Sequence, residues 1–191
     1  MLTDRFAKAA LYAIELHRTQ TRKATSIPYV SHLFAVCGLV LEDGGNEDEA
    51  IAGLLHDGPE DQGGSAVLED IRARFGETVA VMVAALSDAM PAAGEEKPPW
   101  RTRKEAYLSH LESAPASVLR VSLADKLHNA RSILVDMGFD GEAVWQRFNA
   151  GRAEQAWYYG RLLGIFRERI AESRNLPELA RVLGELFPLG Q

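Results

Sequence analysis

Cysteine is almost absent from this sequence. Cys37 is the only one in 191 residues, so an intramolecular disulfide is excluded, and the composition favours a reducing compartment. No apolar run approaches the roughly 20 residues that span a bilayer. The N-terminus, MLTDRFAKAA, also lacks the basic and then apolar layout of a signal peptide. We therefore expect a cytoplasmic protein with no membrane partner.

The sequence also lacks the patterns of a β-protein or of a multidomain chain. Apolar and polar residues do not alternate over any sustained stretch, and no repeat, heptad array or composition shift is present. Apolar residues instead recur at steps of three and four, as in Phe6, Ala9, Ala10 and Ala13. The sequence predicts an all-α fold, a compact single-domain bundle of about eight to ten helices over residues 1–191.

Glycine and proline divide this helical pattern. The predicted helices cover residues 4–19, 29–41, 47–56, 65–74, 77–87 and 101–111, then a helix with Pro115 in its first turn, two further segments and a last helix from about Asn175. Asp57, Gly58 and Pro59 are predicted to interrupt the helix that covers residues 47–56. Gly138 and Gly141 are predicted to bracket a turn, and residues 90–99 a surface loop.

Charge is acidic overall but uneven. The net charge is −6, which argues against general nucleic-acid binding. Basic residues nevertheless gather locally, in three groups: Arg18, Arg22 and Lys23; Lys97, Arg101, Arg103 and Lys104; Lys126 and Arg131. Such groups suit a small polyanion such as a nucleotide, and the alternative is that each is a solvated helix face. The sequence does not indicate an oligomeric state.

Four residues form a candidate metal site. His56 and Asp57 are adjacent at the end of an apolar helix, where both side chains can turn toward one point. His32 lies on the apolar face of an earlier helix, and Asp125 lies inside a later apolar pattern. Imidazole nitrogens with carboxylate oxygens suit Mn²⁺, Fe²⁺, Co²⁺ or Zn²⁺. Taken singly, each residue has an ordinary explanation: a hydrogen-bonded core histidine, or an aspartate paired with Lys126 or Arg120.

A second acidic pair, Glu60 and Asp61, follows the candidate ligands closely. Hydrolysis of a phosphate ester needs a nucleophilic water, whose pKa a metal lowers and whose proton a nearby carboxylate can take. The pair is therefore a candidate for water activation. The alternative is a pair of solvated charges in a loop.

Four ordered segments resemble the hydrolase domain of the RelA/SpoT family, and most of all its free-standing small alarmone hydrolases. They are HRTQTRKATSIPYVSH (17–32), LLHDGPEDQGG (54–64), FGETVAVMVAALSD (75–88) and LADKLHNARS (123–132). The resemblance implies an all-helical HD fold and hydrolysis of the 3′-diphosphate of guanosine tetra- and pentaphosphate. The products are pyrophosphate and GDP or GTP, and the cofactor is Mn²⁺. No synthetase segment is recognised, so hydrolysis alone is expected.

The same resemblance implies roles for individual residues. His32, His56, Asp57 and Asp125 match the metal ligands, and Glu60 and Asp61 match the pair that activates water. The remaining matches concern the purine nucleotide substrate. They are Arg22 and Lys23 for the base and phosphates, Asn129 for the nucleoside, Arg101 and Lys104 for the far phosphates, and Tyr158 as a wall of the nucleoside site. Asn129 lies one helical turn after Asp125, so both can face one pocket.

Three departures from the family pattern leave alternatives open. Ala24 stands where glycine or serine is common, Gln62 replaces a common threonine, and Gly58-Pro59 fills the gap within HD-x-x-ED. Proline fixes φ and removes a donor, so it could alter how Glu60 and Asp61 are presented. The alternatives are the adenosine alarmone (p)ppApp as substrate, an HD phosphohydrolase acting on another nucleotide or dinucleotide such as NADPH, and a catalytically impaired nucleotide-binding module.

Overall fold

The computed structural model describes residues 1–87 and 97–188, so most of the predicted surface loop at residues 90–99 lies outside it. The described residues form ten α-helices and one 3₁₀ helix, which confirms the predicted all-α class. The helices are α1 (Asp4–Leu16), α2 (Val30–Glu42), α3 (Glu47–Leu55), α4 (Gly58–Gln62), α5 (Gly64–Phe75), α6 (Glu77–Leu86), α7 (Trp100–Ser113), α8 (Ala116–Asp140), η1 (Gly141–Arg147), α9 (Arg152–Arg169) and α10 (Leu176–Leu186).

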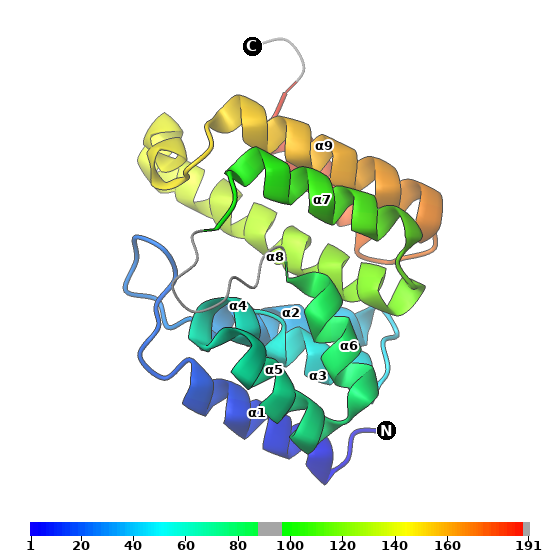
Figure 1. Cartoon of the computed structure of the whole chain (residues 1–191). Coiled ribbons are helices and arrows are strands. Elements are labelled where there is room, and N and C mark those ends of the chain that lie inside the picture. Colours follow the sequence, from blue (N-terminus) through cyan, green and yellow to red (C-terminus); the bar gives the residue numbers. More distant parts are fainter. Residues whose placement is uncertain (88–96, 189–191) are drawn as a thin grey trace.

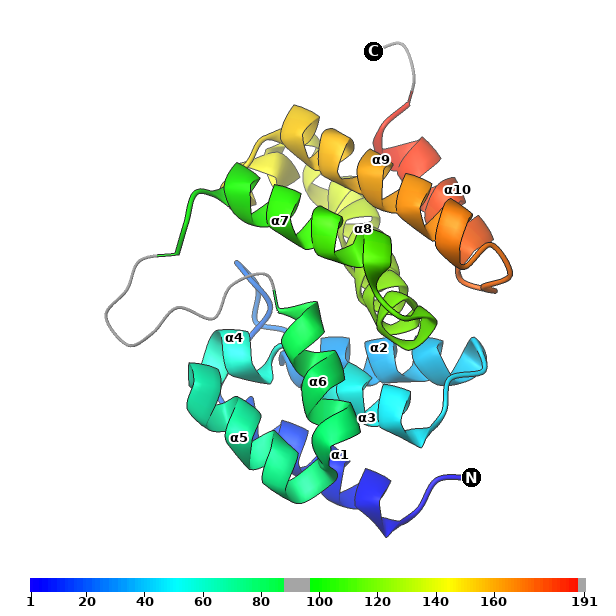
Figure 2. The same ribbon diagram turned by 45° about the vertical axis from the view of Figure 1, so that its right-hand side comes forward.

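Helix α8 is the central element of the fold. Figures 1 and 2 show it running between a group formed by α1 to α6 and a group formed by α7, α9 and α10. It packs against α2, α3 and α6 on one side and against α9, α10 and η1 on the other. Leu119, Leu123 and Leu127, spaced by four residues, are fully buried. Burying each such side chain contributes about 1.5–3 kcal/mol. These leucines therefore stabilise the packing of α8 in the centre of the fold.

Two predicted boundaries were wrong, each for a local reason. Helix α1 ends at Leu16 rather than near residue 19, since the N–H groups of Arg18 and Gln20 form three-residue turn bonds to the carbonyls of Glu15 and His17. The predicted interruption after His56 is confirmed, since α3 ends at Leu55, but Gly58 and Pro59 then begin the short helix α4, because proline in a first turn loses only an N–H that has no helical partner there. Gly138 lies within α8, and the helix ends at Gly141, whose φ of +57° glycine tolerates.

In the described residues, no helix combines the length and apolar character that crossing a membrane requires.

Candidate metal centre

Three separate helices bring the candidate ligands together. His56 follows the last residue of α3 and Asp57 precedes the first of α4, so the pair occupies a two-residue junction between helices. This junction frees both side chains from the 100° offset that adjacent residues have inside a helix. His32 lies in the first turn of α2, and Asp125 lies midway along α8.

The functional atoms of these four side chains converge. Nε2 of His56 lies 3.0 Å from Oδ2 of Asp57 and 3.6 Å from Oδ1 of Asp125. Nε2 of His32 lies 3.5 Å and 3.2 Å from the same two oxygens. His32, His56 and Asp125 are buried, whereas Asp57 is partly exposed. The cluster therefore has a buried base and one side open toward solvent.

Both histidine Nε2 atoms fit a metal ion. Each is buried and has no hydrogen-bond partner, which is costly unless something else uses the lone pair. Nδ1 of His56 donates to the carbonyl oxygen of Gly53 over 2.9 Å, and this directs Nε2 into the cluster. Two nitrogens and two carboxylates suit a divalent transition metal, so the described residues contain a possible metal site.

The carboxylates of the cluster are ionised. Burial acts to raise the pKa of Asp57, but His56 and His32 beside it outweigh burial and lower that pKa well below its usual value. Burial likewise opposes the charge of Asp125, and Lys126 with both histidines lowers its pKa. Nζ of Lys126 lies 2.5 Å from Oδ2 of Asp125. The salt bridge considered as an alternative role for this aspartate therefore forms, in addition to its contacts with the two histidines.

The acidic pair lies on α4, next to the cluster. The backbone N–H of Asp61 bonds to the carbonyl of Asp57 over 3.0 Å, so one turn separates the two carboxylates. Burial and the charge of Asp57 raise the pKa of Asp61, whereas a hydrogen bond from Gln20 lowers it. A carboxylate with a raised pKa is suited to accept a proton from water. Glu60 instead pairs with Lys97 at 2.9 Å.

Two adjoining cavities open beside this cluster. The smaller, of about 280 Å³, is lined by Asp57, Glu60, Asp61 and Asp125 together with cationic and aromatic side chains. The larger, of about 750 Å³, lies between the loop after α1 and helix α8. They share seven lining residues: Tyr29, Asp61, Trp100, Lys104, Lys126, Asn129 and Tyr158. An elongated, highly charged ligand could therefore extend from one into the other.

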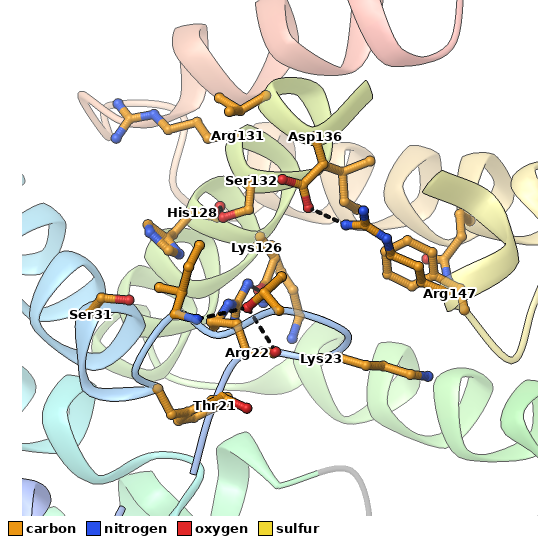
Figure 3. A pocket seen from close by; sticks show the side chains of 18 of the residues that line it. Thr21, Arg22, Lys23, Ser31, Lys126, His128, Arg131, Ser132, Asp136 and Arg147 are labelled. Carbon is orange, nitrogen blue, oxygen red and sulfur yellow. Dashed lines mark hydrogen bonds and ion pairs between the residues drawn. The ribbon is translucent and has the colours of Figure 1, made fainter. Parts of the chain in front are cut away.

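Five of the predicted substrate contacts reach these cavities from the loop after α1 and from α8, α7 and α9: Arg22, Lys23, Asn129, Lys104 and Tyr158. Figure 3 shows Arg22 and Lys23 on the loop opposite side chains of α8. Arg22 donates to Oδ1 of Asn129 over 2.8 Å, and Asn129 donates to Oδ1 of Asp125 over 2.5 Å. The chain of bonds from Arg22 to Asp125 fixes the loop after α1 relative to the candidate ligands. Lys23 contacts Asn149 at 3.3 Å.

The basic patch on α7 is placed differently from the prediction. Lys104 and Tyr158 line both cavities, and Nζ of Lys104 lies 5.1 Å from the Tyr158 ring centroid. Arg101 lines neither cavity, because its guanidinium stacks on Trp157 at 3.2 Å and pairs with Glu105 and Glu154. Arg103 lines the smaller cavity instead. The spacing of Trp100, Arg103, Lys104 and Tyr107 is that of one helix face and is the sequence signal for this placement.

Several residues at the site were not assigned a role from the sequence. Tyr29 donates its hydroxyl hydrogen to Oδ2 of Asp57 over 2.5 Å, and Gln20 donates to Asp61 over 2.8 Å. His128 faces His32, with 2.8 Å between their Nδ1 atoms. All three lie within the segments that carry the family resemblance, yet their partners are distant in sequence, so only the tertiary structure reveals them.

The loop that carries Arg22 and Lys23 has one unusual backbone conformation. Ala24 has a φ of +58°, in the left-handed region that favours glycine. A residue with a Cβ therefore adopts here a turn conformation that is more usual for glycine. The backbone N–H of Arg22 bonds to the carbonyl of Ile27 over 2.8 Å, which closes the loop around this turn.

The fold and the cluster define a class. An all-α bundle that joins a His-Asp pair to a further histidine and aspartate is an HD-type domain. The HD domain family matches residues 9–155, and the chain belongs to this family.

Relatives named as pyrophosphohydrolases are similar over about two thirds of the chain. The guanosine-3′,5′-bis(diphosphate) 3′-pyrophosphohydrolase MESH1 of Xenopus tropicalis is 33% identical over 129 residues, 66% of this chain and 68% of that protein. The probable guanosine-3′,5′-bis(diphosphate) 3′-pyrophosphohydrolase of Synechocystis is 33% identical over 126 residues, which cover 66% of this chain but 16% of that much longer protein. The similarity therefore concerns one part of the longer enzymes.

Solved structures agree over a greater length. The structure of a metazoan ortholog of SpoT, described as hydrolysing ppGpp, superposes with a TM-score of 0.77 at 25% identity and covers 99% of both chains. The protein lmo0812 of Listeria monocytogenes superposes with a TM-score of 0.69 at 27% identity, over 82% of this chain and 98% of that chain. The helical arrangement therefore matches that of the metazoan ortholog over nearly the whole of both chains.

Proposed function

We propose that this protein is a metal-dependent hydrolase that removes the 3′-diphosphate of guanosine tetra- and pentaphosphate, giving pyrophosphate and GDP or GTP. The observation that carries the proposal is the pair of buried, unpartnered Nε2 atoms of His32 and His56 that face two carboxylates at the end of a cation-lined cavity. Relatives named for this activity, which match the segments that hold these residues, support it.

The cofactor in this proposal is Mn²⁺, held by His32, His56, Asp57 and Asp125. When bound, a divalent metal lowers the pKa of water and stabilises charge on phosphate oxygens. Nitrogen and oxygen ligands in equal number are compatible with Mn²⁺, although later transition metals bind most such sites more tightly in vitro. The choice of metal therefore has to be measured by activity as well as by affinity.

The protein's own residues supply the proton acceptor for water and the cations beside the departing diphosphate. Asp61 takes the proton of the attacking water as the new oxygen–phosphorus bond forms and the bond to the ribose 3′ oxygen breaks, and that oxygen leaves protonated by solvent. Glu60, which pairs with Lys97, shares this carboxylate face. Lys104 and Lys126 offset the charge of the departing diphosphate, since both line the smaller cavity.

The nucleoside occupies the larger cavity. Arg22 is held by Asn129 and lies with its Cζ 5.7 Å from the Tyr29 ring centroid, so its planar face can stack on a purine base. Lys23 supplies a cation at the rim, and Tyr158 forms part of the wall. Stacking accepts any purine, so (p)ppApp is included as a second substrate to be tested. Arg101, which lies outside both cavities, has no place in this arrangement.

The proposal extends to the chain as a whole. We take residues 1–191 as one HD unit with a small purine nucleotide as its partner, no nucleic acid and a cytoplasmic location. The single buried cysteine and the acidic charge support this. Gly58 and Pro59 do not argue for an impaired module, because they fit the first turn of α4. A Cβ on Gly58 would lie 2.9 Å from Cδ2 of Leu16, so glycine allows α4 to begin close to the end of α1.

A product assay tests the proposal. The metal-free protein is incubated with ppGpp, ppApp or NADPH, with and without Mn²⁺, and nucleotides and pyrophosphate are resolved by ion exchange. We expect Mn²⁺-dependent release of pyrophosphate with GDP, lost in His56→Ala and kept in His110→Ala, an exposed histidine outside the cluster. Phosphate release from NADPH alone would favour the dinucleotide alternative. No product from any substrate, with ppGpp still bound, would favour the binding module.

A further inference from the structure

The imidazole of His128 lies against a candidate metal ligand. Its Nδ1 is 2.8 Å from Nδ1 of His32, and the ring centroids are 4.8 Å apart. His128 lies on the face of α8 that also holds Asp125 and Asn129, at spacings of three and four residues. It is partly exposed and lines the larger cavity, where Figure 3 shows it beside Ser132. It therefore contacts both the metal cluster and the nucleotide cavity.

The protons on these two rings are linked. A hydrogen bond between two Nδ1 atoms needs one donor and one acceptor, so only one of them carries a proton. A neutral His32 that gives its Nε2 lone pair to a metal keeps its own proton on Nδ1 and must donate it. Nδ1 of His128 then has to be the acceptor, and the proton of His128 resides on Nε2.

The two histidine ligands are thus held by different kinds of partner. His56 donates to the carbonyl oxygen of Gly53, which can only accept, so Nδ1 of His56 keeps its proton whether or not a metal is bound. His32 donates to an imidazole, which can accept or donate. In the described residues, Nε2 of His128 has no hydrogen-bond partner, so this second nitrogen is available to a ligand in the cavity.

We propose that His128 is a positioning residue that selects the metal-binding tautomer of His32 and, in the metal-loaded protein, offers an Nε2–H donor to the nucleotide. This inference rests on the proposed metal site. The tautomers of His32 and His128 are coupled through the hydrogen bond between their Nδ1 atoms. A bound metal therefore favours the tautomer of His128 whose Nε2–H can donate to a phosphate or base acceptor.

Two variants separate the parts of the proposal. His128→Asn keeps an acceptor near the position of Nδ1 and removes the Nε2–H donor, whereas His128→Phe keeps the ring shape and removes both. We expect the dissociation constant for Mn²⁺, measured by titration calorimetry on metal-free protein, to rise about 10–100-fold in His128→Phe. His128→Asn should stay within about threefold of the original protein, because its amide oxygen still accepts from His32. Equal melting temperatures of the metal-free proteins would show that folding is not the cause.

Equal Mn²⁺ affinity in the original protein and His128→Phe would overturn the inference while leaving the proposed function intact. Failure of the original protein to bind any divalent metal would overturn both. Nitrogen-15 spectra of the imidazoles in the unaltered protein test the tautomers even where a variant does not fold. With Zn²⁺ as a diamagnetic probe, we expect a proton on Nδ1 of His32 and on Nε2 of His128. A proton on Nδ1 of His128 would contradict the proposal.

Discussion

The side-chain amide of Gln20 donates a hydrogen bond to Oδ2 of Asp61 over 2.8 Å and so ties the loop after α1 to the acidic pair on α4. The orientation of this amide is fixed from the other side. Its Oε1 lies 2.7 Å from Nδ1 of the buried His17 and also accepts from the side chain of Gln62. Gln62, which replaces a threonine common in the family, thus helps to hold Gln20 in the position that directs its nitrogen to Asp61.

Loss of this donor should shift the pH dependence of turnover. Burial and Asp57 raise the pKa of Asp61, and the bond from Gln20 lowers it, so Gln20→Ala should raise it further. Asp61 accepts a proton only when ionised, hence activity is lost as pH falls through its pKa. A hydrogen bond to a charged group is worth about 1.5–3 kcal/mol, so the acid limb of kcat should move up by about one pH unit.

The control for this shift is Gln146→Ala, an exposed glutamine of η1. Its kcat profile should coincide with that of the original protein. An acid limb that stays in place in Gln20→Ala, or moves to lower pH, would remove Gln20 from this role.

Metal binding should stabilise the folded protein. The unfolded chain has no preformed site, so Mn²⁺ at one hundred times its dissociation constant adds about 2.7 kcal/mol. For a chain of this size that is a rise in melting temperature of roughly 5–10 °C, measured by calorimetry after chelation and after Mn²⁺ addition. The rise should vanish in His56→Ala and persist in His110→Ala. A full rise in His56→Ala would mean that Mn²⁺ binds elsewhere.

Ala24→Gly should stabilise the protein. The φ of +58° at Ala24 costs a residue with a Cβ about 1–2 kcal/mol, which is partly offset by the greater chain entropy of glycine in the unfolded state. We expect a net gain of about 0.5–1 kcal/mol in the free energy of unfolding by urea. Ala7→Gly, at an exposed site of α1, should instead destabilise by about the same amount. A loss of stability in Ala24→Gly would contradict the expected strain.

Much of the fold could be predicted because the helices have a regular apolar period. Helix α5 is longer than its predicted range by one residue at each end, and α6 is shorter by one residue at its C-terminal end. The helix boundaries that were predicted wrongly depend on the tertiary surroundings of the residues concerned. Gly138 is tolerated inside α8 although glycine in a helix costs about 0.5–1 kcal/mol, because the packed helix as a whole outweighs that cost.

The candidate site was predictable where the residue type itself carries the chemistry. His32, His56, Asp57 and Asp125 stand out as polar groups on apolar helices, and the structure brings them together. Gln20, Tyr29 and His128 could not be assigned, because their roles come from partners on other helices. Arg101 was chosen from a charge cluster, which does not show which face of α7 meets the cavity.

The measurement that tests the central claim most directly is hydrolysis of ppGpp in water enriched in oxygen-18, with the products analysed by mass spectrometry. Attack of an activated water on the phosphorus bonded to the ribose 3′ oxygen predicts one heavy oxygen in the pyrophosphate and none in the GDP. Heavy oxygen in the GDP, or release of orthophosphate in place of pyrophosphate, would contradict the account.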